Sequence, residues 1–488
     1  MSNSASAETS GVQQPKPNAA PIKWIPMIIW LGIPAILLML PPPEGLSPQA
    51  WKLAAFYLCA SLGLIFRPLP DPVILLTVLG LYTLSTPGGS RFVMAGYSNG
   101  TTWLVFCAFL VGRTFIETGL GNRVAYFLID KFGNTSLKLG YIAATTDLVI
   151  SPSTPSFTAR TGGLVSPIFR SLAVTLGSEP GATSRRIGGY LILLLNYVGP
   201  ATGTLFLTSN ATNPLAFRLA KDVTGVGDIS WGTYALGALP GVAIMLLLGP
   251  WLVYKLYPPT LKKIDNKVVA KEGLAKLGPM TRNEKVLTLF FLSALTLWST
   301  SHLTRVETAP VAIVFIAALL LFRVISWETL LTEKGAWGTL IWYGGIIGLS
   351  NGLSHHGFFK WMGALVQKNF ALASMDPIMF VCLLIFISLP LHYLIPSIAA
   401  FTSTMVPVYA ILGQAAGAPP MFTAMAVCCT LSIAAVPTHF SHAASPILFG
   451  MGYVDVKTWW LMGLLMMLLG TTVMLGTGIF WWPVIGIY

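Results

Sequence analysis

The chain has 488 residues, of which 54% are hydrophobic and only 9% are charged, and its formal net charge is +12. Soluble domains carry about 25% charged residues, so the composition excludes a soluble protein and indicates an all-α polytopic membrane protein. Most of the excess Lys and Arg lies in loops beside apolar segments, which is a membrane-topology signal and not a sign of nucleic-acid binding.

The N-terminal part begins with a polar tail and continues with apolar segments. Residues 1–23 contain much Ser, Ala, Pro and Gln and lack the apolar core of a signal peptide, so we expect a disordered cytoplasmic tail. The next segments are apolar enough to be transmembrane helices. These predicted spans are residues 24–40, 51–66, 71–88 and 101–118.

Residues 138–175 break this pattern. Two short apolar arms flank a polar tip, 147–163, that contains Pro152, Pro155 and two glycines. Each arm is too short to cross a hydrocarbon core of ~30 Å, and non-helical backbone at membrane depth needs protein or water around it. We therefore predict a re-entrant hairpin whose tip lines a binding site. An ordinary surface loop is the simpler alternative, but Arg160 in the tip would be costly in lipid and points to a functional site.

The rest of the first half contains a broken span, a plain span and a linker. The span near 187–220 is interrupted by glycines, prolines and a polar run that ends at Pro214, which predicts a discontinuous helix. Residues 257–285 are polar and rich in Lys, so we expect a basic cytoplasmic linker. The linker closes a predicted first repeat of residues 24–256.

Residues 286–488 repeat this order of signals. A second hairpin is predicted at 375–413, and the span near 421–450 is again interrupted, by Pro437 and Pro446. Paired interrupted segments at matching positions are typical of transporters built from two inverted repeats. With the hairpins counted as non-crossing, we predict about 11 transmembrane helices. Most loop Lys and Arg then lie on one side, which predicts a cytoplasmic N-terminus and an external C-terminus in a bacterial inner membrane.

Several strings carry a resemblance to a known family. They are Thr154-Pro-Ser-Phe-Thr-Ala-Arg160, Asn213-Pro214, His392-Tyr393, Pro437-Thr-His439 and Phe449-Gly-Met-Gly-Tyr-Val454. Together they resemble the divalent anion/sodium symporter superfamily, and most closely the branch of citrate/succinate and tartrate/succinate antiporters and the chloroplast 2-oxoglutarate/malate translocator. The resemblance implies an elevator-type carrier of di- and tricarboxylates, usually a homodimer, whose substrate lies between the two hairpin tips.

The match to the family's site is uneven. The family's Ser-Asn-Thr signature appears at the first tip as Ser156-Phe157-Thr158, so the asparagine is lost. At the second tip Ser397 matches, but apolar residues replace the small, hydroxyl and histidine side chains of the branch. These replacements are Ile398, Ala399 and Phe401. Apolar side chains cannot donate to a carboxylate, and a buried carboxylate without partners is costly.

An anionic substrate at membrane depth needs hydrogen-bond donors and positive potential, which hydroxyls, half-helix N-termini and a guanidinium supply. Side chains at the two tips and the two helix breaks could provide them, or could instead cap helix ends and bond within helices. For Arg160 the alternative is a structural ion pair with Asp147. The predicted substrate-binding residues are Ser156, Phe157, Thr158, Arg160, Asn210, Thr212, Asn213, Ser397, Thr402, His439 and Ser445.

We expect no catalytic residue, no metal and no cofactor. His439 and His442 have the spacing of a metal pair, but no carboxylate or Cys accompanies them. A Na⁺ site would need amide and carbonyl oxygens where Phe157 and Ile398 stand, and the permanent charge of Arg160 could replace a cation. Sodium coupling is therefore possible but disfavoured.

The sequence thus predicts a secondary active transporter of organic anions, with sodium-independent exchange as the expected mode. Its partners would be a small anionic substrate, the lipid bilayer and a second copy of the chain. The alternative within this class is a Na⁺- or H⁺-coupled symporter of sulfate or another small anion. An anion channel is a further alternative, and a membrane-embedded enzyme would need a nucleophile or metal set that the sequence lacks.

Overall fold

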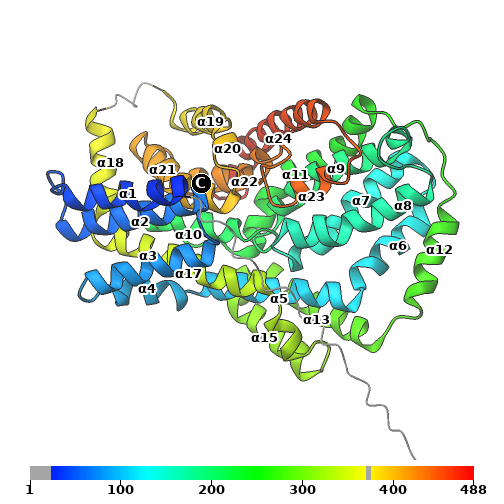
Figure 1. The fold of residues 1–488 in the computed structure, drawn as a ribbon, viewed down its shortest axis with the longest axis horizontal. Helices are drawn as coiled ribbons and strands as arrows, with labels where there is room; N and C mark the ends of the chain where they lie inside the picture. Colours follow the sequence, from blue (N-terminus) through cyan, green and yellow to red (C-terminus); the bar gives the residue numbers. More distant parts are fainter. Residues whose placement is uncertain (1–23, 370–374) are drawn as a thin grey trace, which may run out of the picture.

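The computed structural model describes residues 24–369 and 375–488, and in these residues every regular element is a helix (Figure 1). The all-α class predicted from the sequence is therefore confirmed. The predicted tail, residues 1–23, lies outside the described residues.

In the described part of the first half, helices α1 to α6 come first and are followed by a first hairpin, a first broken helix and one long helix. Its helices are α1 (Trp24–Met39), α2 (Pro48–Phe66), α3 (Asp71–Ser85), α4 (Ser90–Tyr97), α5 (Gly100–Thr118), α6 (Leu120–Phe132), α7 (Ser136–Ile150), α8 (Ser166–Thr175), α9 (Gly188–Leu205), α10 (Thr212–Thr224) and α11 (Trp231–Leu256). A 3₁₀ turn at Ser151–Ser153 and a π-helix at Thr158–Val165 lie between α7 and α8. The first hairpin thus consists of two short helices and an irregular tip; its re-entrant character stays a prediction.

The predicted basic linker is partly helical and is attached to the base of the first hairpin. It contains α12 (Asn266–Leu277). Before α12, Lys263 pairs with Thr135 in an isolated antiparallel bridge. After α12, the Gly278 carbonyl and the Glu284 carboxylate accept hydrogen bonds from Arg123 of α6 at 2.9 and 2.6 Å. The linker therefore packs against the segments that lead into the hairpin.

The second half follows the same order of elements. Its helices are α13 (Arg282–Ser299), α14 (Ser301–Thr304), α15 (Thr308–Leu321), α16 (Trp327–Leu331), α17 (Lys334–His355), α18 (Phe358–Asn369), α19 (Pro377–Ser388), α20 (Leu391–Leu394), α21 (Ile398–Ala415), α22 (Pro420–Ala434), α23 (Ser445–Phe449) and α24 (Val456–Val484). In each half, two helices joined by an irregular tip precede a broken helix and then one long helix. α21, the second arm of the second hairpin, has 18 residues and is longer than the other hairpin arms. An inverted relation between the halves remains a prediction.

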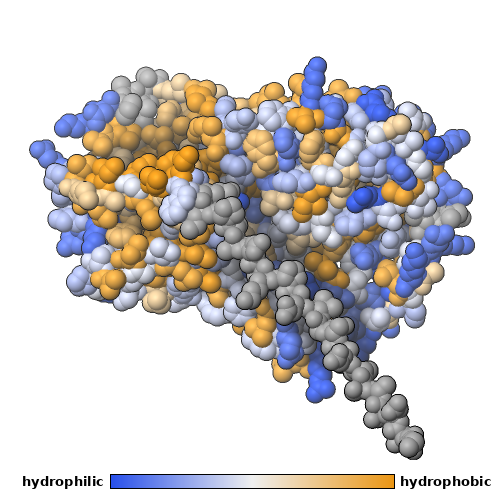
Figure 2. Space-filling view, in the orientation of Figure 1, coloured by the Kyte–Doolittle hydropathy of each residue, from blue (hydrophilic) through white to orange (hydrophobic). Residues whose placement is uncertain are grey.

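The lengths of the helices agree with a multi-pass membrane protein. Among the described residues, α2, α11, α21 and α24 are each long and apolar enough to cross a membrane, and α5 and α6 together pass the same test with a bend of 60° between them. Several other apolar helices are shorter, so the number of crossings stays a prediction. Large apolar side chains of α1, among them Trp24, Ile28 and Met39, are exposed, and hydrophobic residues cover this region in Figure 2. Such a surface is suited to lipid.

The helices form two groups that meet along α2, α10, α17 and α21. The flanking group consists of α1–α4 and α17, which pack on one another at the left of Figure 1. The hairpin group consists of the two hairpins, the two broken helices, α11 and α24. Within residues 24–369 and 375–488, the side-chain hydrogen bonds that join the groups include Tyr57 OH to the Ser403 carbonyl (2.5 Å), Arg67 Nη2 to Ser397 Oγ (2.9 Å) and Arg218 Nη2 to Asn351 Oδ1 (2.8 Å).

Candidate functional site

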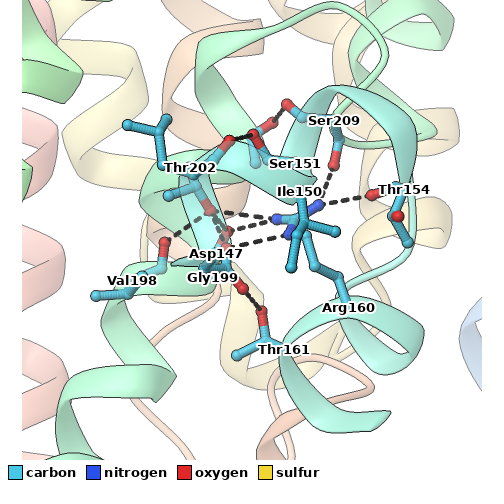
Figure 3. A network of polar contacts seen from close by, with 12 residues as sticks. Asp147, Ile150, Ser151, Thr154, Arg160, Thr161, Val198, Gly199, Thr202 and Ser209 are labelled. Atoms are coloured by element: carbon cyan, nitrogen blue, oxygen red, sulfur yellow. Dashed lines mark hydrogen bonds and ion pairs between the residues drawn. The ribbon is translucent and has the colours of Figure 1, made fainter. Parts of the chain in front are cut away.

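Arg160 lies at the centre of the first tip and is fully buried, as is Asp147 (Figure 3). A guanidinium has five N–H donors, and each one has an acceptor here. The acceptors are Asp147 Oδ2 for Nε (3.0 Å), the carbonyls of Thr154 (2.6 Å) and Ser209 (2.9 Å) for Nη1, and the Gly199 carbonyl (3.1 Å) and Thr202 Oγ1 (3.3 Å) for Nη2. A direct bond from Arg160 to a substrate would require one of these bonds to break.

The same network fastens the first tip to the first broken helix. The Asp147 carboxylate accepts hydrogen bonds from the Thr161 hydroxyl (2.8 Å) and from the Thr202 hydroxyl. The Ala211 amide donates to the Pro155 carbonyl at 3.1 Å. Since the charges of Arg160 and Asp147 balance each other, the network is a neutral connection between α7, the tip, α9 and the break that follows α9.

The polar residues of the first break stabilise the break itself. Asn213 Nδ2 donates to the Gly203 and Phe206 carbonyls at 2.8 and 3.0 Å, which satisfies the end of α9. Asn210 Nδ2 donates to Ser432 Oγ of α22 at 2.8 Å, and its Oδ1 accepts from the Thr212 amide. All three predicted residues, Asn210, Thr212 and Asn213, are buried.

The second break is held by Asn196, which the sequence analysis did not single out. Asn196 of α9 donates through Nδ2 to the Val436 carbonyl (3.1 Å) and accepts through Oδ1 from the Ser445 hydroxyl (3.0 Å). The sequence feature that could have identified Asn196 is the presence of an asparagine within an otherwise apolar span. At the other side of the break, His439 Nδ1 accepts from Trp460 Nε1 at 3.1 Å. Ser445 therefore joins α23 to α9, and one of the two ring nitrogens of His439, Nδ1, is used by Trp460.

Phe157 connects the first tip to the second break. Its ring is 5.8 Å from the ring of His442, edge to face, and 5.4 Å from the Arg160 guanidinium carbon. The absence of a side chain at Gly203 makes room for the ring, because a Cβ there would lie 2.6 Å from Phe157 Cζ. Phe157 thus fills the space between α9 and the second break. Ser156 and Thr158 on either side of it are half-buried.

The second tip has three different kinds of contact. Ser397 caps α21 by accepting from the Ala400 amide at 3.2 Å and also accepts from Arg67. Thr402 is fully buried, and its hydroxyl donates to the Ile398 carbonyl within α21 (2.7 Å). The ring of His392 stacks on Phe401 with centroids 3.6 Å apart. Ser397 is therefore the predicted polar residue of this tip that reaches beyond its own hairpin.

The second break lies between the two tips. Its His442 contacts Phe157 of the first tip, and its Phe440 packs against Tyr393 of the second tip with ring centroids 5.8 Å apart. Of the eleven predicted site residues, seven are buried within the tips and breaks: Phe157, Arg160, Asn210, Thr212, Asn213, Thr402 and Ser445. Four polar ones are half-buried: Ser156, Thr158, Ser397 and His439.

Asn196 offers a direct test of the second break. Asn196→Leu keeps the volume but leaves the Val436 carbonyl and the Ser445 hydroxyl without partners, so we expect a loss of about 1–3 kcal/mol of stability. The measurement is the thermal midpoint of the detergent-solubilised protein. The exposed Asn369, which donates to the Leu365 carbonyl of its own helix, provides the matched control. Equal midpoints for Asn196→Leu and Asn369→Leu would contradict this role.

Two hairpins with irregular tips and two broken helices, packed so that one break contacts both tips, define the class of this protein as a multi-pass membrane transporter. The chain belongs to the family "Sodium:sulfate symporter transmembrane region", which it matches over residues 22–488. The predicted superfamily is thereby confirmed.

Known proteins resemble the chain over nearly its whole length. It is 44% identical to the inner membrane protein YbhI of Escherichia coli over 93% of this chain and 96% of that protein. It is 32% identical to the L-tartrate/succinate antiporter of Escherichia coli over 95% of this chain and 99% of that protein. The crystal structure of the YdaH transporter of Alcanivorax borkumensis has a similar fold, with a TM-score of 0.59 at 11% identity over 88% of this chain and 98% of that chain. Of these proteins, the L-tartrate/succinate antiporter is named as a carrier of organic anions.

Proposed function

We propose that the protein exchanges di- and tricarboxylates across the bacterial inner membrane without sodium. The observation that carries the proposal is the second break, whose His442 contacts Phe157 of the first tip and whose Phe440 contacts Tyr393 of the second tip. The similarity to a tartrate/succinate antiporter supports dicarboxylates and exchange, and the name of the relative YbhI supports the inner membrane.

The proposed transport cycle uses inverted repeats and two access states. In this proposal the N-terminus is cytoplasmic, the C-terminus is external, and the hairpin group moves against the flanking group within each subunit of a homodimer. Few side-chain hydrogen bonds of the described residues join the two groups, and this supports such a motion because few hydrogen bonds have to break. The recurrence of hairpin, broken helix and long helix in each half supports the repeats.

Independence from sodium is supported by what surrounds the two tips. The Phe157 ring fills the space between Gly203 and His442, and apolar Ile398 begins α21 at the second tip. A Na⁺ ion needs several oxygen ligands, which neither side chain supplies. Since Asp147 balances the charge of Arg160, we assign Arg160 a positioning role: it keeps the first tip in place for substrate.

The alternative is a Na⁺- or H⁺-coupled symporter of sulfate or another small anion. The description of the matching family favours it, because that description names sodium and sulfate. Half-buried hydroxyls could serve a sulfate as well as a carboxylate. Dependence on a cation gradient distinguishes the two functions.

Counterflow in proteoliposomes tests the proposed function. Vesicles loaded with unlabelled succinate are expected to take up labelled succinate at the same rate in Na⁺ and in choline buffer, and empty vesicles are expected to take up little. Tartrate, citrate and sulfate are compared as internal anions. Uptake that requires an inward Na⁺ gradient, or counterflow with sulfate alone, would establish the symporter and overturn the exchange proposal.

A further inference from the structure

The cation that contacts the second tip is Arg67, which lies directly after α2 in the left-handed region (φ 45°). Its Nη2 donates to Ser397 Oγ (2.9 Å) and to Asp71 Oδ2 (3.3 Å). The Arg67 side chain is 54% exposed. Both bonds come from one nitrogen, so within the described residues Nε and Nη1 remain available for a further acceptor.

Arg67 and Arg160 differ in what they can offer an anion. Arg160 is fully buried, and all five of its donors are used by the protein. Arg67 is exposed, pairs with a single carboxylate and touches a serine of the predicted site. A guanidinium binds a carboxylate through its N–H groups, so only N–H groups that the protein does not already use can bind a substrate carboxylate. By this criterion, the arginine suited to a substrate carboxylate is Arg67.

The surroundings of Arg67 also attract an anion. α21 begins at Ile398, directly after Ser397, so the guanidinium lies beside the positive end of a helix. Two positive elements repel each other, whereas an anion between them is attracted by both. The Ser397 hydroxyl accepts from Arg67 and from the Ala400 amide, which leaves its own hydrogen to donate to a bound anion.

We propose that Arg67 is a substrate-contacting residue that binds a carboxylate of the transported anion at the second tip, together with Ser397. The proposal rests on the proposed function, since it names a further residue of the same site. Arg67 belongs to the flanking group and Ser397 to the hairpin group. The contact therefore exists in the arrangement described here and is lost when the groups move relative to each other.

The contact is expected to act from one face of the membrane. α1 and α2 are the first two predicted membrane spans, so a chain whose N-terminus is cytoplasmic returns to the cytoplasmic face at the end of α2, where Arg67 lies. Arg67 would therefore affect substrate binding from the cytoplasmic face.

Labelled succinate uptake into inside-out and right-side-out vesicles tests this inference. In Arg67→Gln, the KM for succinate is expected to rise about tenfold at the cytoplasmic face, which is the effect of losing one charge-assisted hydrogen bond, and to change less than twofold at the external face. Arg67→Lys should recover most of the affinity because it keeps the charge. Asp71→Asn should lower the KM, because a competing carboxylate is removed.

Arg323 provides the matched control. It is an exposed arginine that follows α15 in the same left-handed conformation (φ 55°), so Arg323→Gln should leave both KM values unchanged. A cytoplasmic KM for Arg67→Gln within twofold of wild type would overturn the inference. If wild-type vesicles transport no carboxylate, the proposed function fails independently. In that case the anion used is sulfate, and the measurement is the rise in the thermal midpoint that sulfate causes in the purified protein. The inference stands if this rise is seen in the wild type and is lost in Arg67→Gln, and it is overturned otherwise.

Discussion

Asp147→Ala is expected to abolish transport and to lower stability by about 3–5 kcal/mol. The substitution leaves Arg160 as an unpaired charge in a fully buried position, which is among the most costly changes a protein can undergo. It also removes the acceptor that the hydroxyls of Thr161 and Thr202 share. The measurements are succinate counterflow and the thermal midpoint of the solubilised protein.

The double variant Asp147→Ala/Arg160→Met separates the ion pair from the backbone contacts. Replacing both charges removes the unpaired cation, but the carbonyls of Thr154, Gly199 and Ser209 then lose their donor. We therefore expect the double variant to recover only part of the stability and none of the transport. The control is Glu117→Ala, since Glu117 pairs with Arg113 in a partly exposed ion pair of small energetic value. Full transport in the double variant would disprove the positioning role of Arg160.

Gly96→Ala is expected to destabilise the flanking group by about 2 kcal/mol or more. A Cβ on Gly96 of α4 would overlap the carbonyl oxygen of Gly344 and lie 2.5 Å from the amide nitrogen of Gly348, both in α17. Backbone atoms cannot turn away as a side chain can, so the two helices must separate. Close approach through small residues is a common way to join helices in membranes, where the hydrophobic effect supplies little attraction.

Gly80→Ala is the matched control for Gly96→Ala. Gly80 lies in the neighbouring helix α3, and among the described residues no atom outside its own stretch of helix lies within 4 Å of the position its Cβ would take. The expected change in the thermal midpoint is small, or slightly positive because alanine favours the helix. Similar midpoints for the two variants would contradict the close contact between α4 and α17.

The two tips are held in different ways, and this bears on the transport cycle. The first tip is fastened to the first broken helix of its own group through Arg160 and Asp147. The second tip is bonded across the group boundary by Arg67 at Ser397, and its second arm by Tyr57 at Ser403. When the hairpin group moves, the contacts of the second hairpin with α2 must break, together with the bond between Arg218 of α10 and Asn351 of α17. Within the described residues, the second hairpin is the one of the two hairpins whose side-chain hydrogen bonds cross the group boundary.

The sequence by itself determined the all-α class, the first irregular tip and the first helix break. Prolines and glycines interrupt an apolar run locally, so the irregular tip before Arg160 and the break before Pro214 could be read from residue order. The strings around Arg160 and His439 were also enough to predict the superfamily. These features depend on residues that are neighbours along the chain, so the order of residues in the sequence is enough to predict them.

Only the tertiary structure decided which polar atoms meet. Arg160 binds the Ser209 carbonyl 49 residues away, Asn196 binds Ser445 249 residues away, and Arg67 binds Ser397 330 residues away. Hydrogen bonds depend on distance and direction to a few tenths of an ångström, and the packing of segments far apart in the chain sets both. For this reason the sequence pointed to Arg160 as the arginine for the anion, whereas the folded chain uses all of its donors internally and leaves Arg67 exposed beside the second tip.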